Sequence, residues 1–124
     1  MDQKLIFVYN AKAGFVHGVM DLMHKTASPK TYPCKLCMVT FSGATMNRLW
    51  KSYVSGLGIP SVFMHRDEFA KTYPNQQITF PVVLLEEGDS ITTLISSDEF
   101  KNITDLAELM SLLNAKLKKV KTNI

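Results

Sequence analysis

The chain has 124 residues, of which 46% are hydrophobic, 20% charged and 10% aromatic. These proportions are those of an ordinary globular domain, and they exclude a disordered tail, a fibrous repeat and a small disulfide-rich protein. Residues 1–62 carry seven Lys and Arg against two acidic residues, whereas residues 63–124 carry seven against nine. Four lysines form a basic C-terminal tail at 116–124, and the rest of the chain is close to neutral. We therefore expect one domain over 1–124 that binds no nucleic acid.

The apolar runs of the sequence are short, at about five residues, whereas a helix that crosses a membrane needs roughly 20. The run near the N-terminus is likewise too short for the core of a signal peptide. We therefore expect no membrane association and a cytoplasmic location. In a reducing compartment two cysteines three residues apart, Cys34 and Cys37, indicate redox chemistry or metal binding more than a structural disulfide.

Two segments of the first half have clear periodicity. The run 5–9 is apolar and rich in β-branched and aromatic residues, which predicts a buried strand. Residues 15–23 have apolar side chains at helical spacing, and that helix must end before Pro29. Residues 38–41 fit either a strand or a short helix. A further helix is predicted from about Thr45, ending at Gly56 and Gly58, one of them left-handed; its apolar positions are Met46, Leu49, Trp50, Tyr53 and Val54.

The second half contains three predicted strands. Residues 61–64 form an unbroken apolar run, so we expect a strand that lies parallel to 5–9, with both strands central in the sheet. The runs 81–85 and 91–95 flank a turn at 86–89, which predicts an antiparallel hairpin.

Polar residues mark the expected helix starts in this half. Asp67 is the expected cap of a short helix that Pro74 terminates. Ser96 and Glu99 have the spacing of a capping box, and Asn102 is the expected cap of the last helix. The apolar face of that last helix consists of Leu106, Leu109, Met110, Leu113 and Leu117.

The order of these elements, above all over residues 61–117, resembles the thioredoxin-like fold. The resemblance implies a single α/β domain, with a mixed sheet and helices on both faces. It also implies a cis Phe80–Pro81 bond that faces an active dithiol. One feature departs from the pattern, because a thioredoxin carries its CxxC motif directly after the first strand. Here Cys34 and Cys37 follow the first predicted helix instead.

Several short sequence words resemble a narrower group, a family of short bacterial proteins. The most specific are Thr31-Tyr32-Pro33-Cys34-x-Leu36-Cys37 and His65-Arg66-Asp67-Glu68-Phe69, joined by Tyr9-Asn10-Ala11, Asp21 with His24-Lys25, and Ser28-Pro29. The likeness spans most of the chain, and it implies no particular activity.

The two cysteines are the strongest chemical signal. At the start of a helix, backbone N–H groups and nearby cations lower the pKa of a thiol. We therefore expect Cys34 to be the reactive thiol and Cys37 the resolving one, with Lys35 adding positive charge and His24 moving the proton. The alternative is that the two cysteines are small, half-buried hydrophobic residues without chemistry.

A zinc site is the second use of the same cysteines. Zinc needs four ligands, and His24 with His65 or Asp21 would complete the pair of thiolates. His17, Asp21 and His24 share one helix face, which is equally typical of an ordinary solvated face. Because prolines follow the helix, we predict that His24 lies near the cysteines in space and that His17 does not.

A last candidate follows the strand 61–64. The His65 side chain is able to act as a base or a metal ligand, and the Arg66 side chain is able to bind an anion. Both residues follow the strand at its carboxyl end, where open α/β sheets bind ligands. The same residues fit a polar strand end that leads into a helix. Three classes of function stay open at this point: a thiol redox protein acting on a protein or small-thiol partner, with no cofactor; a zinc-binding protein; and a non-catalytic interaction module.

Overall fold

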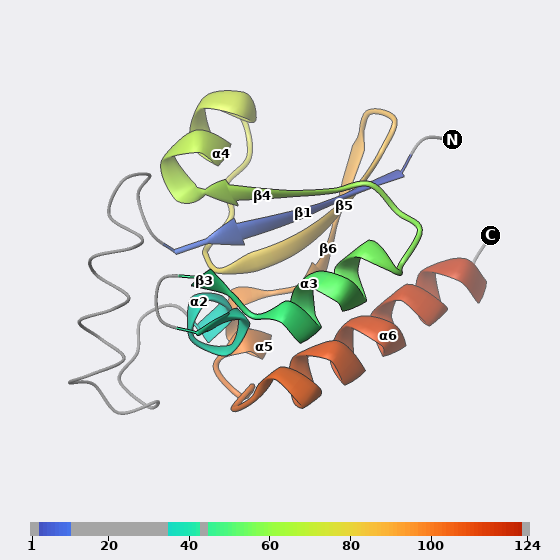
Figure 1. The fold of residues 1–124 in the computed structure, drawn as a ribbon. Coiled ribbons are helices and arrows are strands. Elements are labelled where there is room, and N and C mark those ends of the chain that lie inside the picture. Colours follow the sequence, from blue (N-terminus) through green and yellow to red (C-terminus); the bar gives the residue numbers. More distant parts are fainter. Residues whose placement is uncertain (1–2, 11–34, 43–44, 123–124) are drawn as a thin grey trace.

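The computed structural model describes residues 3–10, 35–42 and 45–122. Its centre is a four-stranded mixed sheet with helices on both faces (Figure 1). The strands are β1 (Gln3–Tyr9), β4 (Ser61–His65), β5 (Val82–Glu87) and β6 (Ser90–Ile95). In the order β4-β1-β5-β6, β1 is parallel to β4 and antiparallel to β5, and β5 is antiparallel to β6. The predicted hairpin and the predicted parallel pair are therefore confirmed.

The strand β1 is central, whereas β4 is not. Residues 5–8 of β1 have no exposed surface, because the strand has a neighbour on each side and helices on each face. Every residue of β4 is half-buried, and no strand among the described residues pairs with its outer side. The expectation that 61–64 is a central strand is thus wrong.

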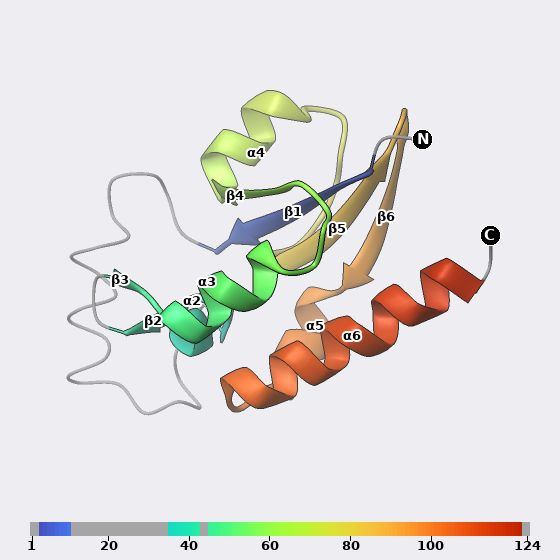
Figure 2. The same cartoon turned by 45° about the vertical axis from the view of Figure 1, so that its right-hand side comes forward.

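Alternate side chains of β1 enter two separate cores. On one face, Ile6 and Val8 pack with Phe69 of α4 (Arg66–Thr72). On the other face, Leu5 and Phe7 pack against α3 (Arg48–Ser55) and α6 (Leu106–Thr122). Of the helices that the structure describes, Figures 1 and 2 show α4 on one side of the sheet and the others on the opposite side. Successive side chains of a strand point to opposite faces of the sheet, so a strand that is buried on both faces has a layer of helices on each side.

The segment that could not be assigned from its sequence contains both a helix and a strand. Lys35–Thr40 is helix α2, which continues directly into β2 (Phe41–Ser42), and β2 pairs with β3 (Thr45–Met46). The helix expected from Thr45 begins at Arg48, because the Asn47 side chain caps it.

The Asn47 Oδ1 accepts hydrogen bonds from the backbone N–H groups of Leu49 (2.8 Å) and Trp50 (3.2 Å). Leu49 is 61% exposed, so it does not belong to the buried face that Trp50 and Val54 form. As expected, one glycine after this helix is left-handed: Gly58 has a φ of 75°.

Two predicted helix caps are wrong and one is confirmed. Helix α4 follows β4 without a break and has His65 at its N-cap position, so Asp67 lies inside the helix and is not its cap. The Glu68 carboxylate accepts a hydrogen bond from the His65 backbone N–H at this helix start. Ser96 and Glu99 form the predicted capping box at α5 (Ser97–Phe100). The last helix, α6, is capped by Asp105 and not by Asn102.

The Asp105 Oδ1 accepts a hydrogen bond of 2.8 Å from the Glu108 N–H. The predicted apolar face of α6 is confirmed, with Leu109, Leu113 and Leu117 buried. The helix continues to Thr122, so the lysines of the basic segment belong to its last turns, and Lys116 pairs with Glu99 at 2.8 Å. The helix predicted for 15–23 lies outside the described residues.

Candidate functional site

Polar side chains gather where the two parallel strands end. Tyr9 lies opposite His65 in the register of β1 and β4, and the centres of their rings are 5.9 Å apart. Asn10 and Arg66 follow these two residues, and the Arg66 guanidinium donates a hydrogen bond of 3.2 Å to the Asn10 Oδ1. The link joins the carboxyl ends of the strands, the edge at which open α/β sheets bind their ligands.

His65 is oriented by a carboxylate. The Glu68 Oε1 accepts a hydrogen bond of 2.8 Å from the His65 backbone N–H and lies 2.5 Å from the Nδ1 of the His65 ring. These hydrogen bonds lower the pKa of Glu68. With its Nδ1 proton directed at Glu68, a neutral His65 ring carries its lone pair on Nε2, the arrangement that suits a base or a metal ligand.

The start of β5 lies at the same edge. Its first residue, Val82, pairs with Val8, so Pro81 is next to the end of β1. Pro81 is buried, and the Phe80–Pro81 peptide bond is cis, as the resemblance implied. Burial in this region also raises the pKa of Tyr9 above its ordinary value.

Helix α2 packs beneath this edge of the sheet (Figures 1 and 2). Leu36 is fully buried in the core that contains Tyr9 and Val83, and Val39 packs against the same core. Cys37 is the third residue of α2. Cys34 precedes the first residue of that helix in the sequence, and it lies outside the described residues.

Some of the other predicted site residues are described by the structure and some are not. His24, like His17 and Asp21, lies outside the described residues, so its predicted closeness to the cysteines stays a prediction. Of the predicted zinc ligands, only the His65 side chain is described, and no three His, Cys, Asp or Glu side chains within 3–10, 35–42 and 45–122 form a metal-binding group.

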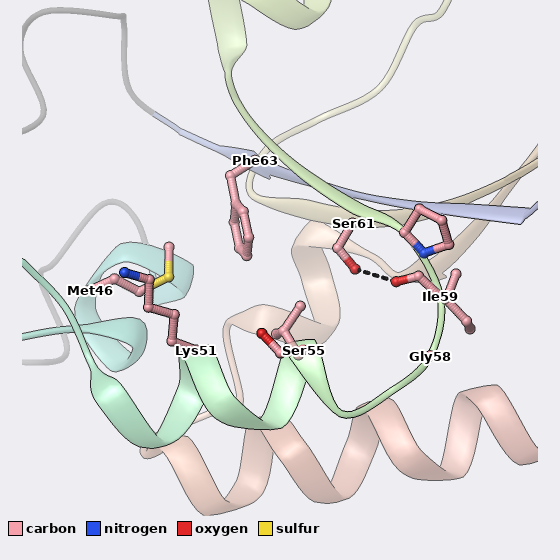
Figure 3. Close-up of a pocket in the computed structure, with 9 residues that line it drawn as sticks. Met46, Lys51, Ser55, Gly58, Ile59, Ser61 and Phe63 are labelled. Atoms are coloured by element: carbon pink, nitrogen blue, oxygen red, sulfur yellow. Dashed lines mark hydrogen bonds between the residues drawn. The ribbon is translucent and has the colours of Figure 1, made fainter.

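A groove between α3 and β4 is a second feature, which the sequence did not predict (Figure 3). It has a volume of about 550 Å³, and its walls come from β3, α3, β4 and the loop between α3 and β4. Its lining is Met46, Lys51, Val54, Ser55, Gly58, Ile59, Pro60, Ser61 and Phe63. The one sequence signal is the absence of acidic residues between Asp21 and Asp67, which leaves the cations of α3 without opposite charges nearby in the chain.

No family model, no curated protein and no solved structure matches this chain. Within the part of the chain that the structure describes, no helix is both long and apolar enough to cross a membrane.

Proposed function

We propose that the chain is a thioredoxin-like domain that uses Cys34 and Cys37 in thiol–disulfide exchange. The strand order β4-β1-β5-β6, with one parallel pair followed by an antiparallel hairpin, supports this fold. Helices on both faces and the cis bond before β5 are the other features that the resemblance implies. The short sequence words that resemble a family of bacterial proteins add no activity to the proposal.

The observation that carries the proposal is the burial of Leu36. The cysteine motif lies later in the chain than in a thioredoxin. From the sequence alone, this displacement would put the two cysteines away from the sheet edge next to Pro81. Leu36, however, stands between the two cysteines and is fully buried in the same core as Tyr9 and Val83. Its burial docks the helix of Cys37 in the main core, and Figures 1 and 2 show that helix close to the end of β1.

The chemistry is a two-electron exchange. The Cys34 thiolate attacks a disulfide of a partner protein or small molecule, forming a mixed disulfide and releasing one partner sulfur as a thiolate that takes up a proton. The Cys37 thiolate then attacks the Cys34 sulfur, so that the second partner sulfur leaves as a thiol. The partner disulfide is reduced, and Cys34–Cys37 is oxidised. Lys35 favours the thiolate, His24 accepts and returns the proton, and a reducing cytoplasm suits such a cycle.

Zinc binding by the same cysteines is the second candidate, and the His65–Glu68 pair favours it. A histidine that binds a metal usually donates its other ring N–H to a carboxylate, as the His65 Nδ1 is placed to do. The free His65 Nε2 would then join the two thiolates and His24 in a tetrahedral site.

The test is to replace Cys34 and Cys37 separately with serine and to measure the alkylation rate of the remaining thiol against pH. Each variant is the matched control of the other, because the chain has only two cysteines. We expect the Cys34 thiol, in Cys37→Ser, to have a pKa clearly below about 8.5, and Cys37 to have an ordinary one. Mild oxidation of the unaltered protein should produce an intramolecular disulfide.

An ordinary pKa for Cys34 together with no intramolecular disulfide would refute the redox function. Elemental analysis of freshly purified protein then separates the alternatives. Bound zinc with masked thiols, lost in His65→Ala, supports the metal site. Two unreactive thiols without zinc leave an interaction module.

A further inference from the structure

The groove between α3 and β4 is apolar inside and polar at its rim. The apolar surface comes from the side chains of Met46, Val54, Ile59 and Phe63. Hydroxyl groups come from Ser55 and Ser61. Figure 3 shows Phe63 projecting from β4 into the space above α3, with Lys51 extending from the helix toward Met46. The Ser61 hydroxyl donates a hydrogen bond of 3.1 Å to the Ile59 carbonyl, which holds it along the β4 wall.

The wall on the β4 side is firmly supported. The Phe63 ring stacks on Phe7 at a centroid distance of 4.9 Å, and Phe7 in turn meets the edge of the Trp50 ring at 5.4 Å. Both Phe7 and Trp50 are fully buried. The β4 wall of the groove therefore rests on the main core, and a ligand would meet a preformed apolar surface. The groove volume of about 550 Å³ lies within the range of about 300–1,000 Å³ typical of small-molecule sites.

The one charged residue that lines the groove within the described part of the chain is a cation, Lys51. A second hollow of about 640 Å³ adjoins the groove through Lys51 and Ser55, and it is also lined by Arg48. Among the described residues, no acidic side chain lines either hollow, and neither Arg48 nor Lys51 forms an ion pair. A third hollow adjoins the groove through Gly58, Ile59 and Pro60. Glu86 lines that hollow, but Lys4 pairs with it at 3.5 Å and offsets its charge.

We propose that this groove binds a small amphiphilic anion, with its hydrocarbon chain against Phe63 and Met46 and its anionic group beside Lys51. The apolar walls favour the hydrocarbon part, because its burial removes apolar surface from water. The unpaired cations select an anionic over a neutral or cationic head group. The site is formed by α3, β3 and β4, and it does not depend on the cysteines.

Decanoate is the probe for the test, with decan-1-ol and decyltrimethylammonium as matched neutral and cationic controls. Each is titrated into the full chain below its micelle concentration, and binding is followed by amide chemical shifts in two-dimensional NMR. We expect saturable shifts centred on residues 54–63 for decanoate, weaker ones for decan-1-ol, and none for the cation.

Two pairs of variants locate the ligand. Lys51→Gln should weaken decanoate binding about two- to fivefold, as expected for an exposed ion pair, and leave decan-1-ol binding unchanged. Its control is Lys71→Gln, the same charge change on α4 at the opposite face of the sheet. Ser55→Phe, which fills the groove, should abolish saturable binding, whereas Ser111→Phe at an exposed position of α6 should not.

Three results would overturn the proposal. The first is decyltrimethylammonium binding as tightly as decanoate, which would remove the role of the cations. The second is the absence of saturable decanoate shifts, and the third is shifts that persist unchanged in Ser55→Phe. Since every substituted side chain is exposed, all four variants are expected to keep their fold, which their amide spectra without ligand verify.

Discussion

Replacing Leu36 by alanine tests whether α2 is anchored in the core. The Leu36 side chain is fully buried among residues of the sheet and α6, so the substitution removes three buried carbon atoms. At about 0.8 kcal/mol for each, the loss of burial alone is about 2.4 kcal/mol. The cavity left behind adds to this, and buried leucines lose about 2–5 kcal/mol in such substitutions. We expect the free energy of unfolding to fall by about 3 kcal/mol.

The chain offers a matched control in Leu49→Ala. Leu49 is 61% exposed on α3, so the same chemical change removes little buried surface there. We expect it to cost about 0.5 kcal/mol or less, typical of a surface substitution. The comparison separates the effect of burial from the effect of changing leucine to alanine in a helix.

Urea unfolding provides the assay for both variants. The single tryptophan, Trp50, is fully buried and reports loss of the core by its fluorescence, while far-ultraviolet circular dichroism reports loss of the helices. Coincident transitions by the two methods justify a two-state free energy. If Leu36→Ala costs no more than Leu49→Ala, α2 is not docked in the core, and the burial of Leu36 no longer supports the proposed redox function.

Three further predictions concern the backbone and the electrostatics. Gly58→Ala should destabilise the fold by about 1 kcal/mol, because the φ of 75° disfavours any side chain. The control is Gly56→Ala, at an ordinary helical φ of −78°, which should cost less. Equal losses of unfolding free energy in chemical denaturation would contradict this. Asp105→Ala removes the cap of α6 and should cost about 1 kcal/mol in the same assay, whereas no loss would mean that the cap is dispensable. The pKa of Glu68 is lowered by its hydrogen bonds to His65, so its stabilising effect is present above its ordinary pKa of 4.5 and is lost as pH falls through the lower folded value. Unfolding free energies at several pH values should therefore show wild type and Glu68→Gln converging in acid, and a gap that does not change with pH would refute this.

Local patterns were sufficient for the main elements of the sheet. The runs at 5–9, 61–64, 81–85 and 91–95 have the residue types that pack well in strands, and each is a strand in the structure. The turn between β5 and β6 was also predictable, because Gly88 takes the positive φ that the hairpin requires. These features depend on neighbours in the chain.

Helix starts were less predictable because several residues near each one are able to cap. Asp67 and Glu68 compete at α4, and Asn102 and Asp105 compete near α6. The residue that is used depends on where the chain turns after β4 and after α5, and each turn must let the helix bury Phe69 or Leu109 in the core. Sequence spacing alone does not contain this information.

The candidate sites depend more strongly than the helices and strands on tertiary structure. From the sequence alone came the α/β class, the strands, the polar end at His65 and Arg66, and the spacing of Cys34 and Cys37 three residues apart. Only the tertiary structure decided that β4 lies at the edge, that Arg66 reaches Asn10, and that Leu36 enters the core. It also decided the groove, because its lining lies within residues 46–63 but its Phe63 wall rests on Phe7 of the distant β1. The physical reason is that periodicity reports which side of an element is buried, whereas a site depends on which distant segments pack together.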